Sequence, residues 1–110
     1  MARSTRLVSE LASIDYVLSA FEDIERLDEF LAQQDGPLTG QLAAFIAKAV
    51  TILAIQPGIG RPTTHNHREL IVHRGRSGYL VRYRYDREQL TVTVLRIRHQ
   101  SESGYTLDEI

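Results

Sequence analysis

The C-terminal segment TVTVLRIRHQSESGY (residues 91–105) contains side chains that can transfer protons and bind phosphate. His99 can act as an acid or a base because imidazole titrates near neutral pH. Tyr105 can donate a proton or stack against a nucleobase. Cleavage of a phosphodiester by its own 2′-hydroxyl needs a base, an acid and positive charge on the transition state. Arginines of the preceding sequence can supply that charge, and the candidates are Arg74, Arg84 and Arg98.

Arginines dominate the second half of the chain. Residues 58–100 contain nine arginines, no lysine and three acidic residues, a net charge of +6, whereas residues 1–57 have a net charge of −4. The planar guanidinium group suits bidentate contacts with carboxylate or phosphate. We therefore predict a basic surface for an anionic partner, either nucleic acid or an acidic protein segment. The predicted anion-binding residues are Arg74, Arg76, Arg82, Arg84, Arg96 and Arg98.

The sequence gives little support for a metal or cofactor site. The chain has no cysteine, which excludes disulfides and thiolate ligands. His65 and His67 in THNHRE suggest a metal pair or an HNH nuclease box, but two histidines in a loop with no further ligand nearby are more often incidental. We predict no metal and no cofactor. No apolar run is long enough to cross a membrane and no signal peptide is evident, so we expect a cytoplasmic protein.

Helical patterns occupy the first half of one predicted domain, residues 14–110, which follows a weakly patterned lead-in at 1–13. The run IDYVL is strand-prone, and Ser19 followed by Glu22 fits a capping box at the start of a first helix. That helix should end at QQDGP. A second apolar stripe predicts a helix over residues 38–56, ended by PGIGRP. The short connection predicts an antiparallel αα-hairpin.

The period of the apolar pattern then changes to two, which indicates strands. Residues 68–74, 78–86 and 90–97 are rich in β-branched and aromatic side chains and are joined by short turns. The predicted fold class is α+β, with the order β-α-α-β-β-β and an antiparallel sheet covered on one face by the αα-hairpin. Strict alternation along the last strand places Arg96 and Arg98 on the same face as Val92 and Val94. The uncovered face should therefore present arginines to solvent.

Five sequence pieces, in order and at fitting spacings, now identify a resemblance. They are SAFEDIERLDEFL, PGIGRP, REL, GYLVRYRYD and VTVLRIRHQ. From about Tyr16 to Tyr105 the chain resembles the RelE/ParE superfamily, the toxin halves of bacterial type II toxin–antitoxin modules. SAFEDIERLDEFL is similar to the family's junction between the first strand and the first helix. PGIGRP is similar to the loop after the second helix in ParE-type members, and VTVLRIRHQ to the closing strand.

The resemblance implies a growth-arresting toxin that is neutralised by a cognate antitoxin in a hetero-oligomer. RelE-like toxins cleave mRNA in the ribosomal A site, whereas ParE-like toxins act on DNA gyrase, and neither kind needs a cofactor. Three interpretations follow for this chain. The first is a ParE-like toxin directed at gyrase, the second a RelE-like mRNA endonuclease acting on ribosome-bound message, and the third a degenerate, non-toxic module that binds an antitoxin.

Individual residues favour different interpretations. If the chain is an mRNA endonuclease, His99 and Tyr105 are its predicted catalytic residues, and His73 falls about where RelE-like members carry a basic catalytic side chain. RelE itself has an arginine directly after the Gly-Tyr of the penultimate strand, where this chain has Leu80. Arg82, one step along the same face, is a candidate replacement. Together with PGIGRP, the change at Leu80 favours the ParE-like interpretation.

Overall fold

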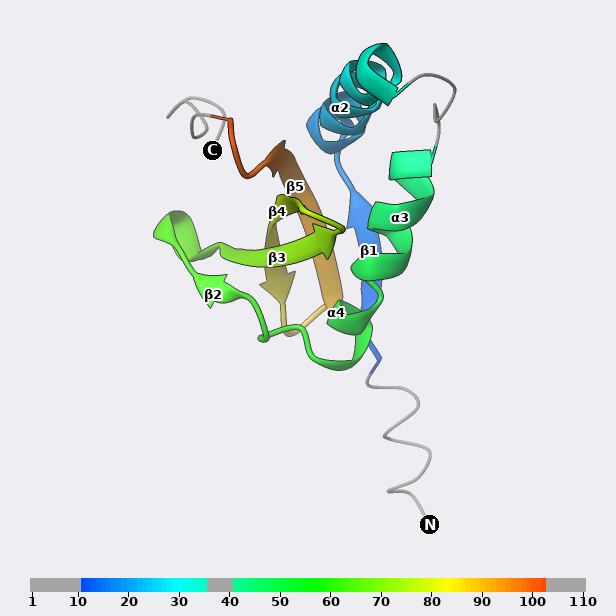
Figure 1. Ribbon diagram of the computed structural model, residues 1–110. Helices are drawn as coiled ribbons and strands as arrows, with labels where there is room; N and C mark the ends of the chain where they lie inside the picture. The colour runs from blue at the N-terminus through cyan, green and yellow to red at the C-terminus, as the bar shows by residue number, and fades with distance from the viewer. Residues whose placement is uncertain (1–10, 36–40, 103–110) are drawn as a thin grey trace.

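The computed structural model describes residues 11–35 and 41–102, which form one five-stranded sheet with helices on one side (Figure 1). The strand order is β1-β5-β4-β3-β2. The predicted lead-in lies outside the described residues up to position 10, and Ala12 is already buried in the core. The elements are β1 (Ser13–Tyr16), α2 (Leu18–Asp35), α3 (Gln41–Ala49), α4 (Ile52–Ile55), β2 (Arg61–Pro62), the 3₁₀ helix η1 (Thr64–Asn66), β3 (Arg68–Arg74), β4 (Ser77–Asp86) and β5 (Thr91–His99).

The predicted α+β class and the β-α-α-β-β-β order are confirmed, with three differences in detail. β1 runs parallel to β5, so one pair of the otherwise antiparallel sheet is parallel. The second helix is interrupted at Val50–Thr51, where the backbone N–H and hydroxyl of Thr51 both donate to the Lys48 carbonyl. A very short additional strand, β2, pairs with β3 immediately after the PGIG turn.

The core lies between the sheet and the helices. β4 supplies its largest side chains, Tyr79 and Tyr83, which are fully buried together with Val81. The helices supply an apolar stripe, and burying it against the sheet is the main driving force for folding. The buried helical residues are Ala20, Ile24, Leu27, Leu42, Ile46 and Leu53. None of the helices described is both long and apolar enough to cross a membrane.

A β-bulge at Leu95 changes which side chains of β5 face the helices. Val94 pairs with Tyr83 and Arg96 pairs with Arg82, so Leu95 has no partner on β4. Such an extra residue shifts the alternation by one position. Val94 and Ile97 therefore both face the core, and Arg96 lies on the opposite face of the sheet. The prediction that Arg96 and Arg98 share a face with Val92 and Val94 was wrong, because it assumed uninterrupted alternation.

The Tyr83 hydroxyl fastens the loop before β2 to the sheet. It donates to the Pro57 carbonyl at 2.7 Å and accepts from the Gly60 N–H at 2.9 Å. A Cβ at Gly60 would lie 2.6 Å from this hydroxyl, so the close approach requires glycine. Burial raises the pKa of the Tyr83 phenol, while the Gly60 hydrogen bond and nearby Arg68 oppose that rise.

We expect Tyr83→Phe to lower the free energy of unfolding by about 1–3 kcal/mol, because the buried Gly60 N–H and the partly buried Pro57 carbonyl lose their partner. Because the folded state favours the neutral phenol, the contribution of Tyr83 is present below pH 10 and is lost as the pH rises beyond it. Urea unfolding at neutral pH and above pH 10 measures both effects. Tyr85→Phe is the control, since the Tyr85 hydroxyl has no hydrogen-bond partner among the described residues. Equal stability of the two variants would contradict the role assigned to Tyr83.

Candidate functional site

The face of the sheet away from the helices, called the outer face below, carries an ionic row across its strands. Glu69, Arg82 and Arg96 are direct cross-strand neighbours. At one end of the row Arg61 donates to the Glu69 carboxylate at 2.8 Å. Glu69 and Arg82 are buried. Much of the charge in this row is therefore balanced within the fold, which makes it structural in character.

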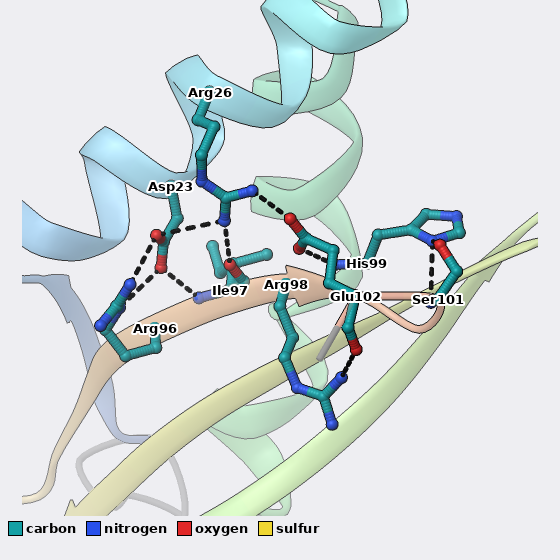
Figure 2. Close-up of polar contacts among 8 residues, drawn as sticks. All are labelled: Asp23, Arg26, Arg96, Ile97, Arg98, His99, Ser101 and Glu102. Atoms are coloured by element: carbon teal, nitrogen blue, oxygen red, sulfur yellow. Dashed lines mark hydrogen bonds and ion pairs between the residues drawn. The ribbon is translucent and has the colours of Figure 1, made fainter. Parts of the chain in front are cut away.

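The other end of the ionic row is held by helix α2. The Asp23 carboxylate accepts two hydrogen bonds from Arg96, at 2.8 and 3.0 Å, and one from the Ile97 N–H at 2.8 Å (Figure 2). Asp23 is only 3% exposed, so its charge depends on these donors. Ser19 and Arg26 contact the neighbouring carbonyls of Leu95 and Ile97.

Through these contacts, helix α2 covers the part of the β5 edge that has no neighbouring strand. β1 pairs with β5 only up to Val94. Beyond that point β5 would present an unpaired edge, which sheet proteins need to cover. Ser19, Asp23 and Arg26 follow each other at positions i, i+4 and i+7 of the helix, and cover this edge through their side chains. The predicted capping box at Ser19 was therefore wrong, since α2 begins at Leu18 and the Ser19 hydroxyl donates to β5.

Glu102, which follows β5 closely, contacts both α2 and the end of β5. Its carboxylate forms an ion pair with Arg26 and accepts from the His99 N–H at 2.8 Å (Figure 2). Its carbonyl accepts from Arg98 at 3.0 Å. The segment after the last strand is thus folded back across the strand end, with Arg98 turned toward the segment's backbone.

His99 lies on the helix-side face, on the opposite side of the sheet from Arg98 and Arg84. It pairs with Tyr79, and the two rings meet edge to face with centroids 5.2 Å apart. Its Nδ1 accepts from the Ser101 N–H at 3.0 Å and lies 2.7 Å from the Ser101 hydroxyl. Arg98 is directed to the outer face, opposite Leu80. The fold therefore separates His99 from Arg98, and the predicted catalytic partner Tyr105 lies outside the described residues.

The predicted anion-binding arginines differ in how much of each side chain reaches solvent. Arg76 and Arg84 are exposed. Arg74 is half-buried, contacts Gln41 at 3.3 Å and lies over the Phe45 ring. Arg82 is buried, and the Arg96 side chain is 13% exposed and engaged by Asp23. Among these predicted residues, the most accessible are therefore Arg76 on the β3–β4 turn and Arg84 on the second half of β4.

A mainly apolar row crosses the outer face beside the ionic row. Ile71, Leu80 and Arg98 are cross-strand neighbours, and Ile71 is 45% exposed. His73 follows on β3, is exposed, and pairs with Gly78. The outer face therefore exposes one aliphatic side chain, Ile71, next to the buried Leu80, with one histidine and one arginine beside them.

The two loop histidines, His65 and His67, lie in η1 and directly after it. His65 and His67 stack loosely, with ring centroids 6.1 Å apart, and no cluster of three candidate ligands occurs within residues 11–35 and 41–102. The pKa of His67 is lowered mainly by burial and further by the positive charge of Arg82, His65 and Arg84. A neutral imidazole near arginines adds a polar group to the outer face without adding charge.

A second surface is the groove between α2 and α3, lined by Tyr16, Phe21, Ile24, Glu25, Ala43 and Ala47. It encloses about 360 Å³ and is almost entirely apolar. Phe21 stacks on Tyr16 with centroids 5.5 Å apart, yet is 52% exposed. The Tyr16 hydroxyl is buried and has no hydrogen-bond partner among the described residues. Such a surface is typical of a site that a partner covers.

Residues 14–104 match the family model described as the ParE toxin of the type II toxin–antitoxin system parDE. The chain belongs to the ParE toxin family. Two solved structures share the fold of this ParE-family chain. One is a chain of the RelBE2 toxin–antitoxin complex from Mycobacterium tuberculosis, which is 23% identical in sequence and superimposes with a TM-score of 0.57. The match covers 84% of the present chain and 94% of the RelBE2 chain. The other is a chain of a chromosomal ParDE system from P. aeruginosa, which is 22% identical and superimposes with a TM-score of 0.65. This match covers 80% of the present chain and 95% of the ParDE chain. A search of curated proteins found no match.

Sequence reasoning located the basic strands of this ParE-family toxin but missed the residues that organise them. Ser19, Asp23 and Arg26 form a polar stripe directly beside the apolar stripe of α2. In this stripe, the acidic residue follows a serine by one turn and precedes an arginine by one turn. That pattern could have predicted a helix packed along a strand edge.

Proposed function

We propose that this ParE-family toxin arrests growth by acting on DNA gyrase rather than by cleaving mRNA. The observation that supports this is the arrangement of the outer face. Ile71 and Leu80 occupy its centre, and His99 faces the helices. An endonuclease needs cations and a proton-transferring group around one phosphate. An exposed isoleucine on the same face as an exposed arginine, Arg84, better suits binding to a protein or protein–DNA surface.

The exposed arginines are the proposed target-binding residues. Arg76 and Arg84 reach solvent, Arg98 lies on the same face as Arg84, and Arg74 lies at the end of β3 on the helix-side face. In this proposal, Arg82 and Arg96 have a structural role as members of the ionic row. Arginine is enriched at the energetically important centres of protein interfaces, and its fork suits acidic partners.

One observation favours the alternative, an mRNA endonuclease acting on the ribosome. His73 is exposed on the outer face, the same face as Arg98 and Arg84. A histidine there can act as a general base, with the arginines stabilising charge. In this alternative His73, rather than His99, performs proton transfer.

Expression of the toxin without an antitoxin separates these functions. We expect induction of the DNA damage response while translation initially continues, and inhibition of supercoiling by purified gyrase. His99→Ala should retain activity within about twofold, because its ring lies on the face away from Arg98, and His73→Ala should do the same.

The alternative functions give different results in the same experiment. Rapid loss of translation with A-site cuts that His73→Ala abolishes would establish the endonuclease. Cuts abolished by His99→Ala or Tyr105→Phe would establish the catalytic residues inferred from sequence. Unaffected growth with wild-type toxin present at normal levels would indicate a non-toxic, antitoxin-binding module.

We also propose that the α2–α3 groove binds the apolar face of a helix from the cognate antitoxin. The groove exposes Phe21, buries the unpartnered Tyr16 hydroxyl and carries Glu25 at its rim. Ala43 and Ala47 lie one turn apart on α3, and their small side chains allow close approach of another helix. Helix-in-groove docking uses anchors at i, i+3, i+4 and i+7, which an amphipathic antitoxin helix would provide.

A further inference from the structure

A polar cleft lies at the end of the sheet opposite His99. It encloses about 580 Å³ and lies where the connection from α4 to β2 passes the β4–β5 turn (Figure 1). This volume falls within the range of small-molecule sites. The cleft is lined by Pro57, Gly58, Asn66, Arg68, Tyr85 and Arg87.

Several backbone carbonyls around this cleft already accept hydrogen bonds within the fold. Arg68 Nη1 donates to the Gly58 carbonyl at 3.1 Å and to the Gly60 carbonyl at 2.8 Å. The Pro57 carbonyl accepts from Tyr83. On the β4–β5 turn, the Asp86 carboxylate accepts from the N–H groups of residues 88 and 89, at 3.0 and 3.1 Å. The Pro57, Gly58 and Gly60 carbonyls and one oxygen of the Asp86 carboxylate are thus engaged within the fold.

The donors around the same cleft remain available. Within the part of the chain that the structure describes, the Gly58 N–H and the Tyr85 hydroxyl have no hydrogen-bond partner. The Arg87 side chain is exposed, and the contacts of Arg68 use only one of its terminal nitrogens. No acidic residue lines the cleft. Two guanidinium groups, an N–H and a hydroxyl without a competing carboxylate favour an anion.

We propose that this cleft binds the phosphate group of a nucleotide. Arg68 and Arg87 supply charge-assisted hydrogen bonds, and Gly58 contributes a backbone donor. The half-buried Tyr85 ring provides an apolar surface beside the phosphate position, on which a base or sugar can pack. The phosphate can belong to a free nucleotide or to a nucleic-acid strand. The site is independent of the outer face, because Arg68 pairs with Tyr83, a residue of the helix-side face.

The proposal is tested with the purified full-length chain by calorimetry against inorganic phosphate, ATP and a single-stranded decanucleotide. We expect binding of ATP, the oligonucleotide or both, with inorganic phosphate weaker. Arg87→Gln should weaken binding about five- to twentyfold, through loss of one charge-assisted contact. Lys48→Gln is the matched control, because Lys48 is an exposed cation on α3 that does not line the cleft, and this variant should leave affinity unchanged.

A second pair of variants tests the position of the anion. Gly58 has open space around an added Cβ, so Gly58→Asp and Gly58→Asn are both accommodated. The introduced carboxylate should weaken binding at least tenfold relative to the asparagine variant, which has nearly the same shape. Tighter binding of ATP than of the oligonucleotide identifies a free nucleotide, and the reverse identifies a nucleic-acid strand. No binding by the wild-type chain, equal affinity of the two Gly58 variants, or equal losses in Arg87→Gln and Lys48→Gln would overturn the proposal.

Discussion

Replacing Asp23 with alanine is expected to lower the free energy of unfolding by about 3–5 kcal/mol, the cost of removing one partner of a buried ion pair. The carboxylate satisfies two donors of Arg96 and the backbone N–H of Ile97. Its loss leaves a guanidinium group that is 13% exposed beside an unpaired strand edge. A domain of this size has a total stability of about 5–15 kcal/mol, so this change would remove a large part of it.

Chemical denaturation monitored by circular dichroism measures this loss. Glu22→Ala is the matched control because Glu22 is an exposed acid next to Asp23 on the same helix, and we expect a change within about 0.5 kcal/mol. In a double-mutant cycle, Asp23→Ala and Arg96→Ala together should cost less than the sum of the single changes. A change in Asp23→Ala no larger than that of Glu22→Ala would refute the assignment of α2 as the cover of the β5 edge.

The elements of this fold could be predicted because local signals mark them. QQDGP and PGIGRP end the two helical segments, and the change from helical to strand periodicity separates the halves of the chain. The break at Val50–Thr51 was not predictable from that periodicity, since the same apolar face continues through Val50 and Leu53. The break depends on a hydrogen bond from Thr51 to the Lys48 carbonyl, which competes with the regular helical pattern.

The arginine-rich strands could be predicted as basic, but not which arginines reach solvent. TVTVLRIRH reads as regular alternation, and the bulge at Leu95 becomes visible only when β5 is paired with β4. One extra residue exchanges the faces of everything that follows it. That shift places His99 against Tyr79 and leaves Arg96 within reach of Asp23. Long-range pairing therefore decides which charges are structural and which are available to bind.

Ala47→Arg in the α2–α3 groove should abolish neutralisation of the toxin by its antitoxin while leaving toxicity intact. Ala47 lines the groove and is itself exposed, so a long charged side chain can be accommodated in the free toxin but obstructs a docked helix. We expect antitoxin affinity to fall on the order of a hundredfold, about 2.7 kcal/mol, as at the centre of an interface. Calorimetry with the purified antitoxin measures the affinity, and growth on co-expression measures neutralisation.

Ala44→Arg is the control that distinguishes obstruction of helix docking from the effect of adding a positive charge to α3. Ala44 is exposed on the same helix but does not line the groove, so the variant adds an identical side chain outside the proposed interface. The antitoxin should still restore growth to cells expressing it. Retained toxicity of both variants shows that each is folded, and neutralisation of Ala47→Arg as complete as that of Ala44→Arg would place the antitoxin elsewhere on the toxin. Because Phe21 and the Tyr16 hydroxyl are already in place without a partner, a helix that docks here gains apolar burial with little rearrangement of the toxin.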